Sequence, residues 1–164
     1  MARPSFLEPA MKNGLACKLL LILGLFASSS HAKEEVLNSP QAGTRTYAQN
    51  YMDMVLAECI ATAYSKERQT TTDAGSSVSA LRDWTHYDWD KHPYHVEVIP
   101  LVNKYLARDY QNPLAESEIK GVRFDFLKCL DLYHSKELDS LVKRVVINPR
   151  RTYRQDNPPS AKPK

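Results

Sequence analysis

The stretch TRTYAQNYMDMVLAECIATAYSKE, residues 44–67, decides the fold class of this chain. Its apolar side chains recur at steps of three and four residues, which is the spacing of one face of an amphipathic helix. The stripe consists of Tyr47, Tyr51, Met54, Val55, Cys59 and Ala63. Polar side chains such as Arg45, Gln49 and Asp53 occupy the other side. The pattern predicts a helix over residues 46–66 with a buried face.

A second helix is expected over residues 76–88. The polar and β-branched run ERQTTT, residues 67–72, separates it from the first helix. Asp73 or one of the following serines can cap it, because their side-chain oxygens accept hydrogen bonds from the free amides of a first helical turn. The small residues that follow Asp73 would then form a narrow helix tip.

The next segment allows two interpretations. The helical spacing of its apolar residues predicts a helix over 99–109, after an irregular connection. Pro100 suits a first helical turn, where its missing amide has no intrahelical partner to lose. Val96 and Val98, however, also fit a short edge strand.

The last apolar block predicts two helices. The face of the first consists of Ile119, Val122, Phe126, Cys129, Leu130 and Tyr133. Ser135 can cap the second, which should stop before Asn148 because Pro149 disfavours a helical residue ahead of it. Its buried stripe consists of Leu138, Leu141, Val142 and Val145. Strand-type alternation of any length is missing elsewhere, so we expect an all-α fold, a small bundle of four to six helices.

Residues 1–32 are expected to lie outside this fold. From Met11 the sequence reads MKNGLACKLLLILGLFASSSHA, with two lysines before the apolar run and a small-x-small motif that ends at Ala32. These are the parts of a secretory signal peptide cleaved after Ala32. The apolar run 19–27 is too short for a membrane-spanning helix, which needs roughly 20 residues, so we expect no membrane anchor after cleavage. A signal peptide that starts at Met11 matches this pattern better than one that starts at Met1, so Met11 could be the true first residue.

Three parts follow the signal peptide. Residues 33–45 form a polar lead-in, residues 46–148 the helical domain, and residues 149–164 a basic flexible tail. The tail is rich in proline and basic residues, which is typical of a solvated chain end. Secretion argues against a nucleic-acid partner for it.

Two cysteines remain after signal cleavage, Cys59 and Cys129. Each lies on the apolar face of its helix, and in an oxidising compartment two inward cysteines on different helices are expected to form a disulfide. The enclosed loop would stabilise the fold by roughly 4 kcal/mol. Two alternatives stay open. The thiols could be buried and inert, or one could be a nucleophile with His134 as its base, which requires a partly exposed thiolate.

Signals for catalysis, metals and cofactors are weak. His86, His92 and His95 lie close together, but their spacing matches no ligand pattern backed by a helical face. The sequence also lacks a phosphate-binding glycine loop, a nucleophile elbow and an HExxH motif. We therefore expect no enzyme, no metal site and no cofactor. The alternative is a non-enzymatic helical protein that binds a metal or a small ligand through these histidines.

Three segments resemble a known family. They are TYAQNYMDMVLAECIATAY (46–64), DAGSSVSALRDW (73–84) and YLARDYQNPLAESEIKGVRFDFLKCLDLYHSKELD (105–139). In this order they resemble the immunity proteins that neutralise the fourth class of type VI secretion amidase effectors. The resemblance covers roughly residues 46–148 and does not extend to the charged tail. Residues 86–100 match it less well.

The resemblance implies a function and a setting. Members of this family are all-helical, are exported to the periplasm and associate as homodimers. They bind a Cys–His peptidase of the NlpC/P60 type that cuts peptidoglycan stem peptides, and they obstruct its cleft. A homodimeric periplasmic inhibitor of such an effector is therefore expected, which protects the cell from itself and its kin.

An inhibitor of this kind needs a narrow element and anchoring side chains on its surface. The predicted helix tip consists of Ala74, Gly75, Ser76 and Ser77, which are small enough to enter a cleft. A neighbouring set consists of Arg82, Asp83, Tyr87, Asp88, Trp89 and Asp90. Arg and aromatic residues are common interface anchors, and the carboxylates, with Glu97, could steer a basic partner. In the alternative, the tip is only a capped helix start whose Val78, Leu81 and Trp84 enter the core.

Overall fold

The computed structural model describes residues 40–111, 113 and 119–158, all within the unit Leu37–Lys164. The predicted signal peptide and most of the lead-in lie outside the described residues. The elements are the 3₁₀ turn η1 (Gln41–Thr44) and the helices α1 (Tyr47–Ala63), α2 (Arg68–Arg82), α3 (Tyr94–Leu106), α5 (Asp125–Tyr133), α6 (Lys136–Val145) and α7 (Tyr153–Asp156). The described part of the chain is therefore helical, as predicted, and none of its helices is long and apolar enough to cross a membrane.

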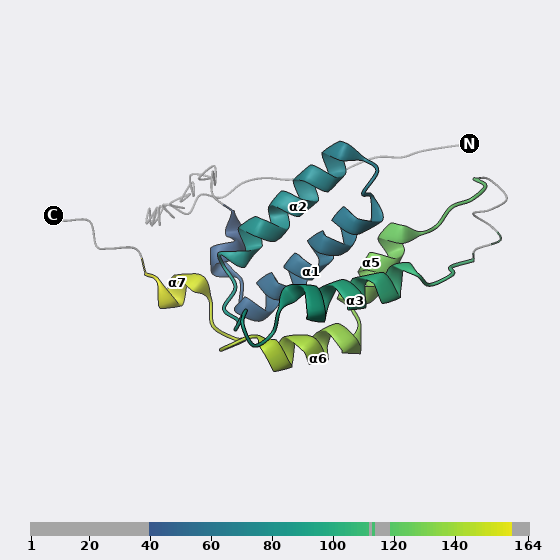
Figure 1. The fold of residues 1–164 in the computed structure, drawn as a ribbon. Coiled ribbons are helices and arrows are strands. Elements are labelled where there is room, and N and C mark those ends of the chain that lie inside the picture. The colour runs from purple at the N-terminus through teal and green to yellow at the C-terminus, as the bar shows by residue number, and fades with distance from the viewer. Residues whose placement is uncertain (1–39, 112, 114–118, 159–164) are drawn as a thin grey trace, which may run out of the picture. The chain divides into compact units, whose positions relative to one another are not determined.

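Helix α1 is the central element, and α2, α3, α5 and α6 all pack against it (Figure 1). Its start is fixed by a capping box, in which Thr46 and Gln49 each accept a hydrogen bond from the other's backbone amide. Its residues Tyr51, Met54, Val55 and Cys59 are almost completely buried. The predicted helix over 46–66 is confirmed, because an apolar stripe of this length has to be covered on several sides.

Helix α2 begins earlier than predicted. The run 67–72, expected to break the chain, lies almost wholly inside it, so the predicted start at 76 is wrong. Thr71 donates from Oγ1 to the carbonyl of Tyr64 at 2.7 Å, and three serines donate to carbonyls four residues before them. Such bonds satisfy polar side chains within a helix. Packing along α1 outweighs the weak helix propensity of these residues.

Helix α2 also ends at Arg82, not at residue 88. The amides of Trp84 and Thr85 bond to carbonyls three residues back, at 3.1 Å each, which closes the helix with tight turns. Asp73 lies in the middle of α2 and caps nothing, so the predicted narrow helix tip does not exist. The capped-start alternative is wrong for the same reason, although Val78 is buried as it required.

Helix α3 starts before its predicted first residue at 99. The carbonyl of Pro93 accepts hydrogen bonds from the amides of Val96 and Glu97, at 2.9 and 3.1 Å, and so opens the helix. Pro100 lies inside α3 rather than in its first turn, and the edge-strand alternative is wrong. The buried residues of α3 are Val98, Val102 and Tyr105. Burying Val98 on the same face as the other two extends the helix toward its N-terminus.

Helix α5 starts at Asp125, whereas its sequence pattern predicted a helical face from Ile119 onward. Gly121 and Phe124 have positive φ values of 75° and 54°, which end any helix that reaches them. Ile119 is 65% exposed and Phe126 is 50% exposed, so neither belongs to the buried face as predicted. The buried residues of α5 are Lys128, Cys129 and Leu132.

Helix α6 agrees with its prediction. The side chain of Ser135 accepts a hydrogen bond from the amide of Leu138 at 3.0 Å, which caps the helix. The four predicted apolar residues are buried, and α6 ends at Val145, ahead of Asn148 and Pro149.

Residues 149–157 are folded, where a flexible tail was expected. The carbonyls of Pro149 and Arg151 accept hydrogen bonds, at 3.1 and 2.8 Å, from the first two amides of α1, which have no partner within their own helix. The Tyr47 hydroxyl donates to Asp156 Oδ2 at 2.7 Å. Burial and this hydrogen bond raise the pKa of Tyr47 to about 12.

The predicted disulfide between Cys59 and Cys129 is confirmed. It joins α1 to α5, and the two Cα atoms lie 5.6 Å apart. Both residues are completely buried. Neither cysteine is a free thiolate in this structure, so the alternatives of inert thiols and of a nucleophile with His134 as base are both wrong.

Candidate functional site

The first group of predicted partner-binding residues lies on α2. Ala74, Gly75, Ser76 and Ser77 occupy the middle of the helix, so they form no tip that could enter a cleft. A Cβ atom added at Gly75 would meet nothing within 4 Å, so this glycine is not required for close packing. The serines are exposed, and a role for this helix face in partner binding stays a prediction.

The second group lies at the end of α2 and in the connection to α3. The guanidinium of Arg82 lies over the ring of Trp89, 4.4 Å from its centroid. Trp89 in turn packs against Tyr87, with ring centroids 3.8 Å apart and ring planes tilted by 42°. Tyr87 is only 4% exposed, so it is a core residue and not a surface anchor. The carboxyl residues of this group, Asp83, Asp88 and Asp90, are exposed.

The three histidines point to no shared ligand. His92 Nδ1 lies 3.2 Å from Glu97 Oε1, and His86 packs edge-on against Tyr47. His95 is exposed. Within residues 40–111, 113 and 119–158, no group of three or more His, Cys, Asp or Glu residues is arranged to hold a metal ion.

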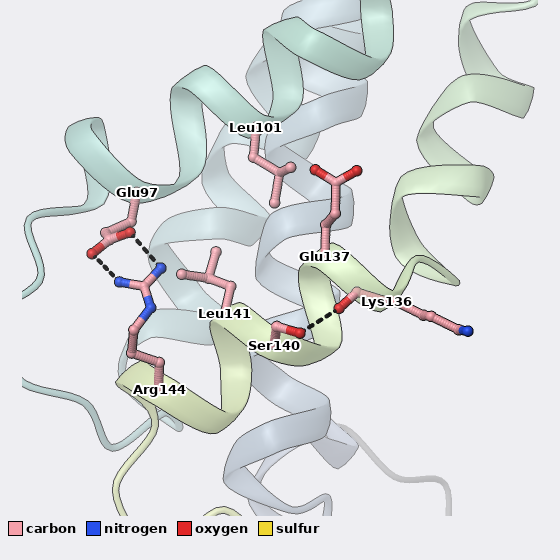
Figure 2. Close-up of a pocket in the computed structure, with 7 residues that line it drawn as sticks. All are labelled: Glu97, Leu101, Lys136, Glu137, Ser140, Leu141 and Arg144. Atoms are coloured by element: carbon pink, nitrogen blue, oxygen red, sulfur yellow. Dashed lines mark hydrogen bonds and ion pairs between the residues drawn. The ribbon is translucent and has the colours of Figure 1, made fainter.

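A groove of about 460 Å³ runs between α3 and α6 (Figure 2). At one end Arg144 forms a bidentate pair with Glu97, with hydrogen bonds of 2.6 and 2.9 Å. Toward the other end Lys104 pairs with Glu137 at 2.7 Å. Leu101 and Leu141 line the groove between these pairs. The groove is thus apolar along its middle and has a salt bridge toward each end.

The electrostatics of this groove indicate a structural role. The hydrogen bond from Arg144 lowers the pKa of Glu97, and the hydrogen bond from Lys104 lowers the pKa of Glu137. The hydroxyl of Ser140 donates to a backbone carbonyl of its own helix at 2.7 Å. The two carboxylates, Arg144 and the Ser140 hydroxyl therefore each have a partner within the protein, and the two ion pairs along the groove join α3 to α6.

An exposed apolar surface lies around the start of α5. We call it the α5 N-terminal surface, and it consists of Tyr64, Val122, Phe124, Phe126 and Leu127. Phe126 and Leu127, which are adjacent on α5, are 50% and 45% exposed. Large apolar side chains gathered in this way are typical of interaction surfaces.

The backbone before α5 shapes this surface. Phe124 adopts the left-handed conformation, which is costly for a residue with a side chain. Its side chain lines two neighbouring hollows of about 300 and 500 Å³. A strained backbone of this kind is more common at functional positions than elsewhere, and here it separates two recesses that could receive side chains of a partner.

Arg123 borders the α5 N-terminal surface, and Lys120 lies two residues before Val122 in the sequence. Lys120 is exposed, and the Arg123 side chain is 73% exposed with its Nε 3.4 Å from the Asp125 carboxylate. The Asp125 side chain is only 12% exposed and also pairs with Lys128. The accessible charge beside the apolar residues is therefore positive.

The sequence pattern did not identify this surface. Two of its residues, Val122 and Phe126, were assigned to one buried helical face, which required the helix to run through Gly121 and Phe124. One signal was available in FDFLKCL, residues 124–130, where apolar residues occur on more sides of a helix than one core can cover. An excess of this kind indicates exposed apolar side chains.

Comparison with known proteins identifies the family. Residues 49–142 match the family model of the type VI secretion system amidase immunity protein Tai4. A solved structure described as new type VI-secreted toxins and self-resistance proteins in Serratia marcescens is 27% identical, with a TM-score of 0.64 over 74% of this chain and 94% of that chain.

The fold is also similar to a chain in the effector–immunity system Tae4/Tai4 from Salmonella typhimurium, in its selenomethionine variant. The identity is 22% and the TM-score 0.54, over 65% of this chain and 95% of that chain. A search of curated protein sequences found no match. Since the family model covers more than half of the sequence, the chain belongs to the type VI secretion system amidase immunity protein family.

Proposed function

We propose that this protein binds a cognate amidase effector of the NlpC/P60 type in the periplasm and blocks its peptidoglycan-cleaving site. The observation that carries this proposal is the family match over residues 49–142. The predicted signal peptide supports the periplasmic setting, and the buried disulfide fits an oxidising compartment.

Inhibition of this kind needs no chemistry from the inhibitor. A rigid scaffold that covers the cleft and excludes substrate is sufficient, and a standard interface buries roughly 1,600 Å² in total. The four helices around α1 and the disulfide supply the rigidity. We therefore assign the protein a steric mechanism.

The α5 N-terminal surface is the contact region that the geometry supports best. Its half-exposed Phe126 and Leu127 can act as apolar anchors, since a few such residues usually carry most of the binding energy. Arg123 and Lys120 would form a polar rim beside them. The effector segment that fits this surface is apolar with a neighbouring carboxylate.

The acidic side chains near α2 are proposed to assist encounter. Asp83, Asp88 and Asp90 are exposed and can attract a basic effector over several ångströms, which raises the association rate more than the affinity. Glu97 does not contribute to this steering, because its carboxylate is paired with Arg144 within the fold. An association rate that does not change between low and high salt would contradict the steering.

The experiment expresses the candidate effector in the periplasm with and without this protein. We expect lysis without it and survival with it. Phe126→Ser combined with Leu127→Ser should weaken effector binding about 100-fold or more, the usual scale for two central anchors. Val96→Ser is the matched control, because Val96 is 58% exposed on α3, away from this surface. Lysis in the presence of the wild-type protein would refute the immunity function.

We further propose that the protein forms a homodimer, on the basis of the family resemblance. Sedimentation of the mature protein measures this directly. A single species at the monomer mass over the micromolar range would contradict it. Repeating the measurement with the effector bound would show whether the complex needs both copies.

A further inference from the structure

Lys128 is the one charged residue that is buried in the described part of the chain, and it is 3% exposed. Its ammonium donates to the backbone carbonyl of Leu106 at 3.2 Å and to Asp125 Oδ1 at 3.0 Å. Burying an ammonium group is costly unless it is paired in this way. A lysine at position 128 therefore requires both of these acceptors.

The two partners of Lys128 lie at opposite ends of one connection. Leu106 is the last residue of α3, and Asp125 is the first residue of α5. A single buried ammonium thus links the end of α3 to the start of α5. The ammonium offsets the partial negative charge at the C-terminal end of α3, and it holds the Asp125 carboxylate in the first turn of α5. A cation at a helix C-terminus and an anion at a helix N-terminus both interact favourably with the helix dipole.

A second contact supports this link from the α3 side. Tyr110 donates a hydrogen bond from its hydroxyl to Asp131 Oδ2 on α5. Arg108 lies over the Tyr105 ring at 3.5 Å and donates to the Tyr110 hydroxyl at 3.4 Å. The ammonium of Lys128 also lies over the Tyr110 ring, 5.8 Å from its centroid, so Lys128 takes part in this second contact as well.

Attachment of α5 to the core does not require Lys128. The next residue, Cys129, already joins α5 to α1 through the disulfide. A buried ion pair is often no more stabilising than apolar residues of the same size, whereas it can specify one arrangement. The start of α5 has no side-chain cap of its own, and the backbone of Phe124 before it is in the left-handed conformation. The first turn of α5 therefore needs another interaction, such as this ion pair, to specify its arrangement.

We propose that Lys128 is a positioning residue for inhibition. Its ammonium fixes the first turn of α5 against the end of α3, and so sets how Phe126 and Leu127 are presented to the effector. This inference rests on the proposed function, because it concerns the surface that the effector contacts. Lys128 itself does not contact the effector, since its side chain is only 4% exposed.

Lys128→Met tests this, because methionine fills the same space without the charge. We expect the variant to bind the effector at least 10-fold more weakly. Amide hydrogen exchange at residues 121–127 should become faster, while exchange in α6 stays unchanged. Lys128→Arg keeps a cation at this position and should restore part of the affinity.

Val145→Ala is the matched control, since it removes buried volume from α6, far from this link along the chain. It should lower the Tm without changing effector affinity. If Val145→Ala weakens binding as much as Lys128→Met, the effect is one of general stability and the inference is wrong. Unchanged affinity and exchange in Lys128→Met would overturn it as well.

Asp125→Asn is the second variant, for the case that Lys128→Met does not fold. It keeps the bond from Lys128 to Leu106, which joins α5 to α3, and weakens the pairs that Asp125 forms with Lys128 within α5 and with Arg123. We therefore expect a smaller loss of affinity. Unchanged affinity would overturn the inference. A wild-type protein that does not bind the effector would instead refute the proposed function, and hydrogen exchange at 121–127 would still report on the role of Lys128.

Discussion

Removing the disulfide should cost this fold a large part of its stability. The proposed change is Cys59→Ala combined with Cys129→Ala, because a single replacement would leave a reactive thiol. The bond closes a loop with a sequence separation of 70. The chain-entropy model for a loop of this length gives about 4 kcal/mol, against an unfolding free energy of about 5–15 kcal/mol for a typical domain.

Urea unfolding followed by circular dichroism measures this loss. With a denaturant slope of about 2 kcal/mol per molar urea, the midpoint should fall by about 2 M. Wild-type protein unfolded with a reductant is the control, since it lacks the bond but keeps both side chains. The two should agree within about 1 kcal/mol, which is the order of the packing change from cysteine to alanine.

Two results would refute this reasoning. A loss below about 1 kcal/mol would mean that the bond does not restrict the unfolded chain as the loop-entropy model requires. Rapid reduction of the native protein without denaturant would contradict the complete burial of both cysteines. We expect the native disulfide to react only as fast as the protein opens.

Three further predictions concern α2, the α3–α6 groove and the chain end. Gly75→Ala should raise the unfolding free energy by about 1 kcal/mol, because Gly75 is inside a helix with open space around it; a loss of stability in urea unfolding would contradict this. Arg144 lowers the pKa of Glu97 below its ordinary 4.5, so the pair stabilises the fold fully above pH 4.5, and this contribution is lost as the pH falls through the lowered pKa. Glu97→Gln should therefore reduce the loss of stability between neutral and acidic pH, and an unchanged pH profile would argue against the pair. Deleting residues 149–164 removes two backbone hydrogen bonds to the first amides of α1 and should cost about 2 kcal/mol; a truncated protein that melts like the full chain would show that this end is dispensable.

The agreement between sequence and structure differs from helix to helix. Helices α1 and α6 were predicted well because their apolar stripes and capping residues indicate the same boundaries. Helix α2 was misjudged because Thr70–Thr72 and the serines have weak helix propensity, and only packing along α1 makes them helical. Helix α5 was predicted too long because its pattern continues through Phe124, whose left-handed backbone no periodicity indicates.

The candidate site depends on tertiary structure more than the fold class does. The narrow tip at residues 74–77 rested on a helix that begins at about residue 76, and this start is wrong. Tyr87 is in the core, while Phe126, expected in the core, is half-exposed. A pattern shows which residues are apolar, but the side that faces solvent depends on where a helix starts and what packs on it.

The sequence by itself determined the helical class, the central helix and the cysteine pair, because helical spacing and inward cysteines are local properties of the chain. Only the tertiary structure decided that residues 149–157 fold against the start of α1, that Lys128 is buried between two helix ends, and that the start of α5 exposes its apolar side chains. These features depend on contacts between residues far apart in the chain. Their free energies come from burial and pairing, which no short stretch of sequence specifies.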